Sequence, residues 1–202
     1  MSDTINEEHA EKMRQVQAEQ RAKMKERKKA TRGLLAVYTG EGKGKSSSAL
    51  GVVLRALGWN HDVAIVQYIK GTWKTGEKQF FERFSDLVTI RRMGEGFTWN
   101  TQDRERDIAA AKAAWETSLG FMRSGDFDLV VLDELNITLR YGYLEAEEVV
   151  EGLASRHQRT TVIVTGRDAP QSLMDAADLV SDMRNVKHPF DAGIKAMRGF
   201  DF

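Results

Sequence analysis

Residues 34–46 read LLAVYTGEGKGKS, and this stretch decides the fold class of the chain. An apolar run is followed by a glycine-rich turn over residues 40–44, and Lys45 and Ser46 then open a helical stretch. A strand, a glycine turn, Lys-Ser and a helix form the pattern of a phosphate-binding P-loop. Glycines let successive backbone N–H groups converge on an anion, and the helix N-terminus adds its positive dipole end. The sequence therefore predicts a site for a nucleoside triphosphate.

The residues of this loop have separate expected tasks. Lys45 is placed to reach the outer phosphates, and the hydroxyl of Ser46 is placed to ligate Mg²⁺. The residues expected to bind ATP are Gly40, Glu41, Gly42, Lys43, Gly44, Lys45 and Ser46. Two features depart from the usual pattern, because Thr39 stands where a glycine is common and Lys43 adds a cation. A glycine-rich turn without a ligand is the alternative, but the strand before and the helix after favour a specialised P-loop.

Length, charge and cysteine content narrow the class of protein. A chain of 202 residues suits a single α/β domain with a sizeable core. The formal net charge is zero, which gives no reason to expect nucleic acid as a partner. The absence of cysteine excludes disulfides and thiolate metal sites. No apolar run reaches the roughly 18 residues of a membrane span, and the polar N-terminus lacks a secretory segment. We therefore expect a cytoplasmic protein with no membrane partner.

Residues 1–32 differ in composition from the remainder of the chain. They are rich in Glu, Gln, Lys and Arg, and they hold no Gly or Pro. Seven Lys or Arg face a single acidic residue, Glu26, between Arg21 and Arg32. We expect a helical arm, either solvated or folded over a ligand or partner. Without interleaved aromatic residues, the basic stretch gives little support for nucleic-acid binding.

From residue 33 onward, short β-rich runs alternate with helical patterns. The expected strands cover residues 34–39, 63–69, 88–92, 129–133, 161–165 and 179–182. The expected helices cover residues 46–57, 77–84, 104–122, 145–155 and 170–177. This alternation indicates βαβ units with right-handed crossovers. The prediction is therefore an α/β, RecA-like P-loop domain over residues 33–202, with a mostly parallel sheet and helices on both faces.

A second candidate site lies at the end of the apolar run 129–132, where Asp133 and Glu134 follow directly. P-loop proteins use an acidic strand end near the metal. On a strand beside the P-loop strand, such a carboxylate would lie near Ser46. We therefore expect Asp133 or Glu134 to hold Mg²⁺ together with Ser46. Successive strand residues point to opposite faces, so one of the two is expected to contact the metal directly.

A third feature is the segment GEGFTWNTQ at residues 94–102, which follows an expected strand. Loops at the carboxyl ends of strands bind ligands in open α/β sheets. Exposing Phe97 and Trp99 together is costly unless the two rings cover a flat apolar ligand. The alternative is that both rings anchor the loop into the core.

The sequence resembles the bacterial ATP:corrinoid adenosyltransferases that make adenosylcobalamin. The matching segments are VYTGEGKGKSSSALG (37–51), VQYIKGTWKTGE (66–77), GFTWNTQ (96–102), VVLDELN (130–136), VIVTGR (162–167) and KHPFDAGIKA (187–196). They run from the P-loop to the C-terminus in the family's order. The Lys-rich loop that departs from the general pattern resembles the family's own version, in which Thr usually stands at the position of Ser46.

The resemblance implies transfer of the 5′-deoxyadenosyl group of ATP to the cobalt(I) of a corrinoid, with triphosphate as the leaving group. It implies that Phe97 and Trp99 displace the lower axial ligand of cobalt, that Lys45 acts on the triphosphate, and that ATP binds the loop in a reversed sense. Cobalt is the nucleophile, so no protein nucleophile is required. The resemblance also suggests a reduced flavoprotein as reductant, a homodimer, and a lid role for residues 1–32.

Two other functions fit parts of the sequence. A general P-loop ATPase or kinase would need a residue that activates water or an acceptor, for which Glu134 is the candidate. A nucleotide-dependent binding module would use the basic arm to dock a partner. The aromatic segment at residues 94–102 favours the adenosyltransferase, because an ATPase has no use for an aromatic wedge.

Smaller roles are expected for residues near these segments. Asp168 is expected to cap the helix that begins near residue 170, and Arg167 to contact phosphate or solvent. Structural or dimer contacts are expected for His188 and Asp191. The remaining residues, Lys70 and Trp73, are expected to border the corrinoid pocket.

Overall fold

A computed structural model describes residues 2–27, 30–69, 75–92 and 103–201 of the chain. The chain divides into two compact units, Met1–Thr31 and Arg32–Phe202. The first unit contains the helix α1 (Ser2–Glu26), whose residues from Asn6 onward are all exposed. An exposed helix is what its polar, charged composition favours. Within the described residues, no helix combines the length and apolar character needed to cross a membrane.

The second unit is built on a six-stranded sheet in which every pair of neighbouring strands is parallel. The strands are β1 (Leu35–Thr39), β2 (Val63–Gln67), β3 (Val88–Arg92), β4 (Leu129–Asp133), β5 (Thr161–Thr165) and β6 (Leu179–Asp182). Their order across the sheet is β3-β2-β4-β5-β1-β6. The four inner strands are almost wholly buried, as their continuous apolar runs predict.

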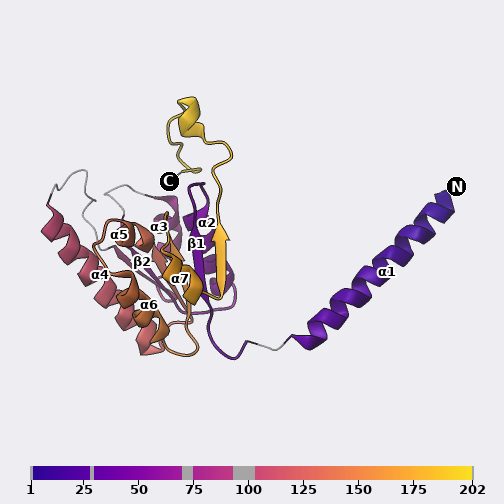
Figure 1. Ribbon diagram of the computed structural model, residues 1–202, viewed down its shortest axis with the longest axis horizontal. Helices are drawn as coiled ribbons and strands as arrows, with labels where there is room; N and C mark the ends of the chain where they lie inside the picture. The colour runs from indigo at the N-terminus through magenta and orange to yellow at the C-terminus, as the bar shows by residue number, and fades with distance from the viewer. Residues whose placement is uncertain (1, 28–29, 70–74, 93–102, 202) are drawn as a thin grey trace. The chain divides into compact units, whose positions relative to one another are not determined.

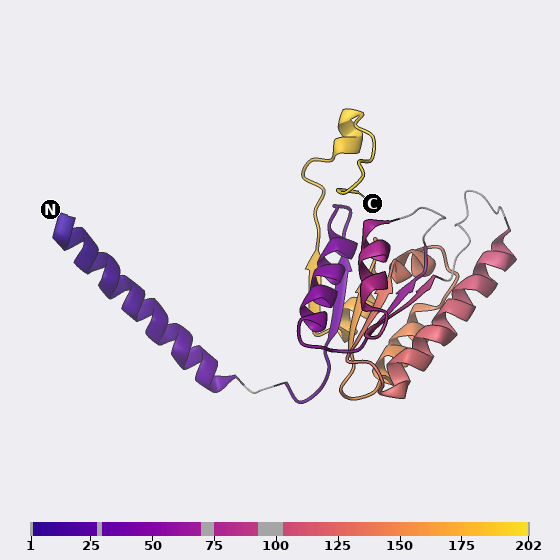
Figure 2. The same cartoon turned by 180° about the vertical axis from the view of Figure 1, so that it is seen from behind.

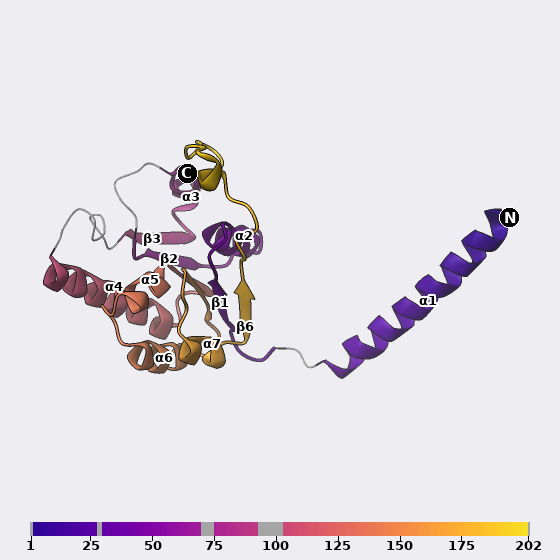
Figure 3. The ribbon, with the colours of Figure 1, turned by 45° about the horizontal axis from the view of Figure 1, so that its top comes forward.

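Helices cover both faces of this sheet. The helices are α2 (Lys45–Leu57), α3 (Gly76–Phe81), α4 (Arg104–Ser124), α5 (Leu135–Arg140), α6 (Ala146–Ala154) and α7 (Gln171–Ala176). Short 3₁₀ turns occupy Glu82–Phe84 and Pro189–Ala192. Helices α4 to α7 lie on the face seen in Figure 1, whereas α2 and α3 lie on the face seen in Figure 2. Figure 3 shows the two helical layers with the sheet between them.

The core is divided between the two faces because successive strand residues point in opposite directions. Val37, Val66 and Val164 pack with the α4–α6 side, and their neighbours Ala36 and Ile65 pack with α2 and α3. On α4, one face is buried at Ala111, Trp115, Leu119 and Met122, with Ile108 packed beside it, at the three- and four-residue spacings of an amphipathic helix. The predicted α/β class with a parallel sheet and helices on both faces is confirmed.

One helix was missed from the sequence, and two expectations about the fold are wrong. The helix α5 was not predicted, because it begins directly after β4 without a loop. Asp168 does not cap α7, since its own backbone is left-handed, at φ 54°, and its carboxylate pairs with Arg140 at 2.9 Å. The acidic strand β4 is not beside β1, because β5 lies between them. Strand order depends on pairing between distant segments, which local periodicity does not encode.

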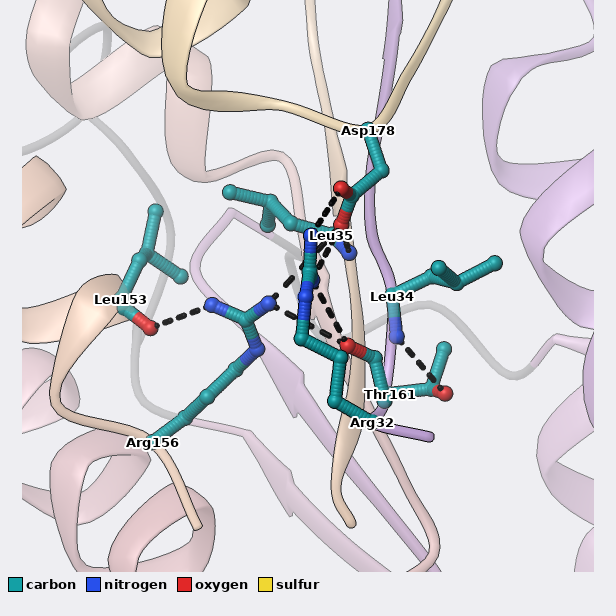
Figure 4. Close-up of polar contacts among 8 residues, drawn as sticks. Arg32, Leu34, Leu35, Leu153, Arg156, Thr161 and Asp178 are labelled. Carbon is teal, nitrogen blue, oxygen red and sulfur yellow. Dashed lines mark hydrogen bonds and ion pairs between the residues drawn. The ribbon is translucent and has the colours of Figure 1, made fainter. Parts of the chain in front are cut away.

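An ion-pair cluster fixes the start of β1 to the start of β6 (Figure 4). Arg32 Nη1 donates to Asp178 Oδ2 at 2.8 Å, and the backbone N–H of Leu35 donates to the same oxygen at 2.9 Å. Arg156 approaches that oxygen at 3.9 Å. The hydrogen bond from Arg32, followed by that from Leu35, lowers the pKa of Asp178 to about 2. The carboxylate is therefore charged throughout the neutral range.

Candidate active site

A cavity of about 840 Å³ lies at the carboxyl ends of the strands, where open parallel sheets place their ligands. The P-loop, the end of β4, the turn after β5 and the C-terminal segment all line it. The loop residues in its wall are Gly42, Lys43, Gly44, Lys45 and Ser46. Figure 1 shows the C-terminal segment, in yellow, beyond the carboxyl end of the sheet.

The glycines of the loop allow a close backbone approach. The N–H of Gly42 donates to the carbonyl of Met183 at 2.6 Å, and a Cβ at Gly42 would lie 2.5 Å from the carbonyl oxygen of Arg184. Gly44 has a φ of 113° and precedes α2, a conformation that side-chain-bearing residues rarely adopt. The segment after β6 therefore forms one wall of the phosphate loop, and the loop needs glycine at position 42 to accept it.

Lys45 folds back over the loop that precedes it. Its ammonium donates to the carbonyls of Gly40 and Gly42, at 2.6 Å each. Burial, and next the nearby charge of Arg167, lower the pKa of Lys45. The lysine is thus held at the mouth of the loop by neutral acceptors, which an anionic phosphate can replace.

Asp133 is the centre of a polar cluster. Its side chain is 1% exposed, and its Oδ1 accepts hydrogen bonds from Ser46 Oγ and Thr165 Oγ1, both at 2.8 Å. Gln67 Nε2 donates to Oδ2 at 3.4 Å. The contact between Ser46 and Asp133 forms although β5 separates their strands, because α2 packs across β5 onto β4. Three side-chain donors therefore converge on one buried carboxyl group.

Glu134 follows with an unusual backbone. It has φ 66° and ψ 20°, a left-handed conformation that costs a non-glycine residue about 1–2 kcal/mol. Its N–H donates to Thr165 Oγ1 at 2.9 Å, and the residue lines the cavity. The left-handed turn interrupts the alternation of β4. Glu134 therefore lines the cavity directly, whereas Asp133 is buried behind Ser46.

The donor set at this point fits Mg²⁺. Ser46, Asp133 and Glu134 offer hydroxyl and carboxylate oxygens, the hard ligands that Mg²⁺ prefers. Within the described part of the chain, no group of three or more His, Cys, Asp or Glu is placed to hold a metal ion. Mg²⁺ is commonly held by one or two carboxylates together with substrate phosphates and water.

The other charges of the loop are paired across the cavity. Glu41 forms an ion pair with Arg167 at 3.1 Å. Lys43 forms an ion pair with Asp201 and lies 6.0 Å from the ring centre of Phe200. The hydrogen bond from Lys43 lowers the pKa of Asp201. The charge of Glu41 in the loop is therefore neutralised by Arg167 from the turn after β5.

Sequence reasoning missed two parts of the site. Thr165 was not singled out, although its position at a polar strand end was a usable signal. Asp201 gave no signal in the sequence, because its partner Lys43 lies 158 residues earlier in the chain. His188, for which a structural or dimer contact was expected, lines the cavity, whereas Asp191 is not among the lining residues.

The aromatic segment lies outside the described residues. Phe97 and Trp99 belong to it, and Lys70 and Trp73 belong to the undescribed residues 70–74, so their predicted roles stay predictions. The described residues break off after Arg92, the last residue of β3, and resume at Asp103.

Residues 31–202 match the family model described as ATP:corrinoid adenosyltransferase BtuR/CobO/CobP. A corrinoid adenosyltransferase of Pseudomonas aeruginosa is 53% identical over 171 residues, which cover 85% of this chain and 84% of that protein. One from a Sinorhizobium species is 44% identical over 196 residues, covering 96% of this chain and 91% of that protein. One from Escherichia coli K12 is 44% identical over 171 residues, or 85% and 86% of the two chains.

The family model covers the whole P-loop unit, including the phosphate loop, the acidic end of β4 and the turn after β5. The relatives agree with one another in name and cover most of the chain. The protein belongs to the ATP:corrinoid adenosyltransferase family.

Proposed function

We propose that this protein transfers the 5′-deoxyadenosyl group of ATP to the cobalt(I) of a corrinoid and releases triphosphate. Membership of the adenosyltransferase family over residues 31–202 carries the proposal. The cavity at the phosphate loop supports it, because a volume of about 840 Å³ accepts a nucleotide. The reaction serves adenosylcobalamin synthesis or salvage.

The chemistry requires a good leaving group more than a protein nucleophile. The electron pair of cobalt(I) attacks the ribose 5′-carbon, a cobalt–carbon bond forms, and the carbon–oxygen bond to the triphosphate breaks. The triphosphate leaves with the electron pair of the broken carbon–oxygen bond. Lys45, Lys43 and the loop N–H groups stabilise the departing charge. Arg167 can join them by exchanging its partner Glu41 for a phosphate oxygen.

Ser46, Asp133 and Glu134 are proposed to hold Mg²⁺. When bound, this ion neutralises phosphate charge and orients the triphosphate. Ser46 and Glu134 face the cavity. Asp133 acts from beneath, by accepting the hydroxyl hydrogen of Ser46 and so directing the oxygen lone pairs outward. Both carboxylates therefore have a task, one at the cavity wall and one below it.

Phe97 and Trp99 are proposed to pack against the lower face of the corrin ring and to displace the axial ligand. A four-coordinate cobalt(II) is easier to reduce, and flat aromatic rings exclude water without offering a ligand atom. A reduced flavoprotein as electron donor, a homodimer and a cytoplasmic location belong to the same proposal. The lid role of residues 1–32 stays a prediction.

The test is anaerobic incubation of the protein with ATP, Mg²⁺ and chemically generated cob(I)alamin. We expect a light-sensitive cobalt–carbon product and an equal amount of triphosphate, measured by absorbance and by phosphate analysis. Formation of ADP and phosphate without this product would instead support the general ATPase. ATP that is bound but unchanged would support a nucleotide-dependent binding module.

A further inference from the structure

Thr165, the last residue of β5, links the two acidic residues of the candidate site. Its hydroxyl donates to Asp133 Oδ1 at 2.8 Å and accepts the N–H of Glu134 at 2.9 Å. The side chain is 0% exposed, so solvent does not offer these groups another partner. One hydroxyl therefore fixes a carboxylate and the peptide group that follows it.

These two hydrogen bonds control different properties of the site. The bond to Asp133 holds the carboxylate rotamer that also accepts Ser46, whose Oγ lies 2.8 Å from the same oxygen. The bond from the N–H of Glu134 fixes the peptide that leads into a left-handed residue. Such an observed backbone outlier persists because its surroundings hold it. The direction in which Glu134 enters the cavity thus depends on Thr165.

We propose that Thr165 is a positioning residue for the metal and the triphosphate, acting through Asp133 and Glu134. It lines the cavity but is fully buried, so the proposed effect runs through the two residues that it holds. Thr165 sets the geometry of Ser46, Asp133 and Glu134 before ATP or the metal ion binds. This inference rests on the proposed function, because it assumes that these three residues hold Mg²⁺. Groups behind metal ligands typically alter metal affinity by about 10-fold to 100-fold when removed.

The experiment compares ATP binding by the full-length protein with saturating Mg²⁺ and with a chelator present, using isothermal titration. The gain in ATP affinity caused by Mg²⁺ is the readout. We expect Thr165→Val, which keeps the shape but loses both hydrogen bonds, to reduce this gain by about 10-fold. Thr165→Ser keeps the hydroxyl, and its gain should stay within about 2-fold of the wild type. Affinity without Mg²⁺ should be similar in all three proteins.

Thermal unfolding is measured in parallel, because a merely structural role would lower stability without altering the Mg²⁺ gain. If Thr165→Val does not fold, Thr165→Ala removes the same hydrogen bonds without a methyl group against the carboxylate. If Mg²⁺ increases the ATP affinity of either variant as much as it does that of the wild-type protein, the inference is overturned. A wild-type protein with no Mg²⁺ gain overturns both the metal assignment and the inference. The adenosylation assay then decides separately whether the proposed reaction stands.

Discussion

Lys45 and Ser46 are adjacent in the chain, yet they point to different parts of the site. Lys45 lies over the loop carbonyls, and Ser46 lies over the buried carboxylate of Asp133. The first turn of α2 produces this division, because consecutive helical residues project about 100° apart. Lys45 can therefore bind a phosphate group, while Ser46 is held by its hydrogen bond to Asp133.

Lys45→Ala should weaken ATP binding by about 10-fold to 100-fold, because a charge-assisted contact to phosphate contributes about 1.5–3 kcal/mol. Isothermal titration with Mg²⁺ and ATP measures the change. Lys78→Ala is the matched control, since Lys78 pairs with Glu82 on the exposed surface of α3. Normal ATP affinity in the Lys45 variant would contradict the P-loop assignment.

Phe97→Ala and Trp99→Ala should abolish adenosylation of cob(II)alamin in the presence of a protein reductant, while ATP affinity stays within about 2-fold, because the proposed wedge acts on cobalt and leaves the phosphates untouched. Product absorbance and ATP titration give the two readouts. Trp59→Ala provides a control, because Trp59 is 78% exposed on the turn after α2. Full activity of both aromatic variants would show that the assigned role is wrong.

At the scale of the element, the helices α4 and α6 pack closely at Gly152, which has no side chain. A Cβ added at Gly152 would lie 2.3 Å from Trp115 Cζ2 and 2.9 Å from Leu119 Cδ2. Trp115 is among the largest fully buried side chains of the protein. The contact between these helices therefore depends on glycine in α6 and an indole in α4.

Gly152→Ala should lower the free energy of unfolding by about 1–3 kcal/mol, because overpacking a buried contact outweighs the roughly 1 kcal/mol of helix propensity that alanine adds. Gly120→Ala is the control within α4, since a Cβ there meets nothing within 4 Å. That variant should be neutral or more stable. Urea unfolding followed by circular dichroism compares the two. Equal free energies of unfolding for the two variants would show that Trp115 can move to accommodate the added methyl group without loss of stability.

At the scale of the whole P-loop unit, ion pairs join segments that are far apart in the sequence. Arg32 and Asp178 pair across 146 residues at one end of β1, and Lys43 and Asp201 pair across 158 residues at the other. Between them, β6 pairs with β1 through four residues. The last quarter of the chain is therefore part of both the sheet and the cavity wall.

The pairing of Asp178 predicts a pH dependence of stability. Its folded pKa, about 2, lies below the value of about 3.9 expected for an unfolded chain. The stabilisation is therefore fully present above about pH 4 and is lost as the pH falls towards 2. Asp178→Asn should be less stable than the wild type by about 1 kcal/mol at pH 7, a figure reduced by the partial exposure of the pair. The difference should shrink progressively below pH 4.

Chemical unfolding at pH 7, 4 and 2.5 measures this difference. Asp86→Asn is the matched control, because Asp86 is exposed on the turn before β3. It should show little change at any of the three values. A constant deficit for Asp178→Asn across this range would mean that the loss arises from packing and not from the carboxylate charge.

The sequence by itself determined the strands, the P-loop and the alternation of helices. Residues 63–66 and 129–132 are continuous apolar runs, and the glycine turn precedes a Lys-Ser pair. These are local patterns, so neighbouring residues are enough to reveal them. Asp133 and Glu134 were identified in the same way, as an acidic strand end.

Only the tertiary structure decided how these parts meet. It placed β5 between β1 and β4, and it brought Thr165 under Asp133 and Glu134. It also set Met183 against Gly42. Each of these arrangements joins segments separated by about 30 to 140 residues, and the pairing energy of such segments is not visible in the periodicity of either one. The physical reason is that strand order and side-chain convergence are properties of the closed sheet, whereas propensity belongs to each segment alone.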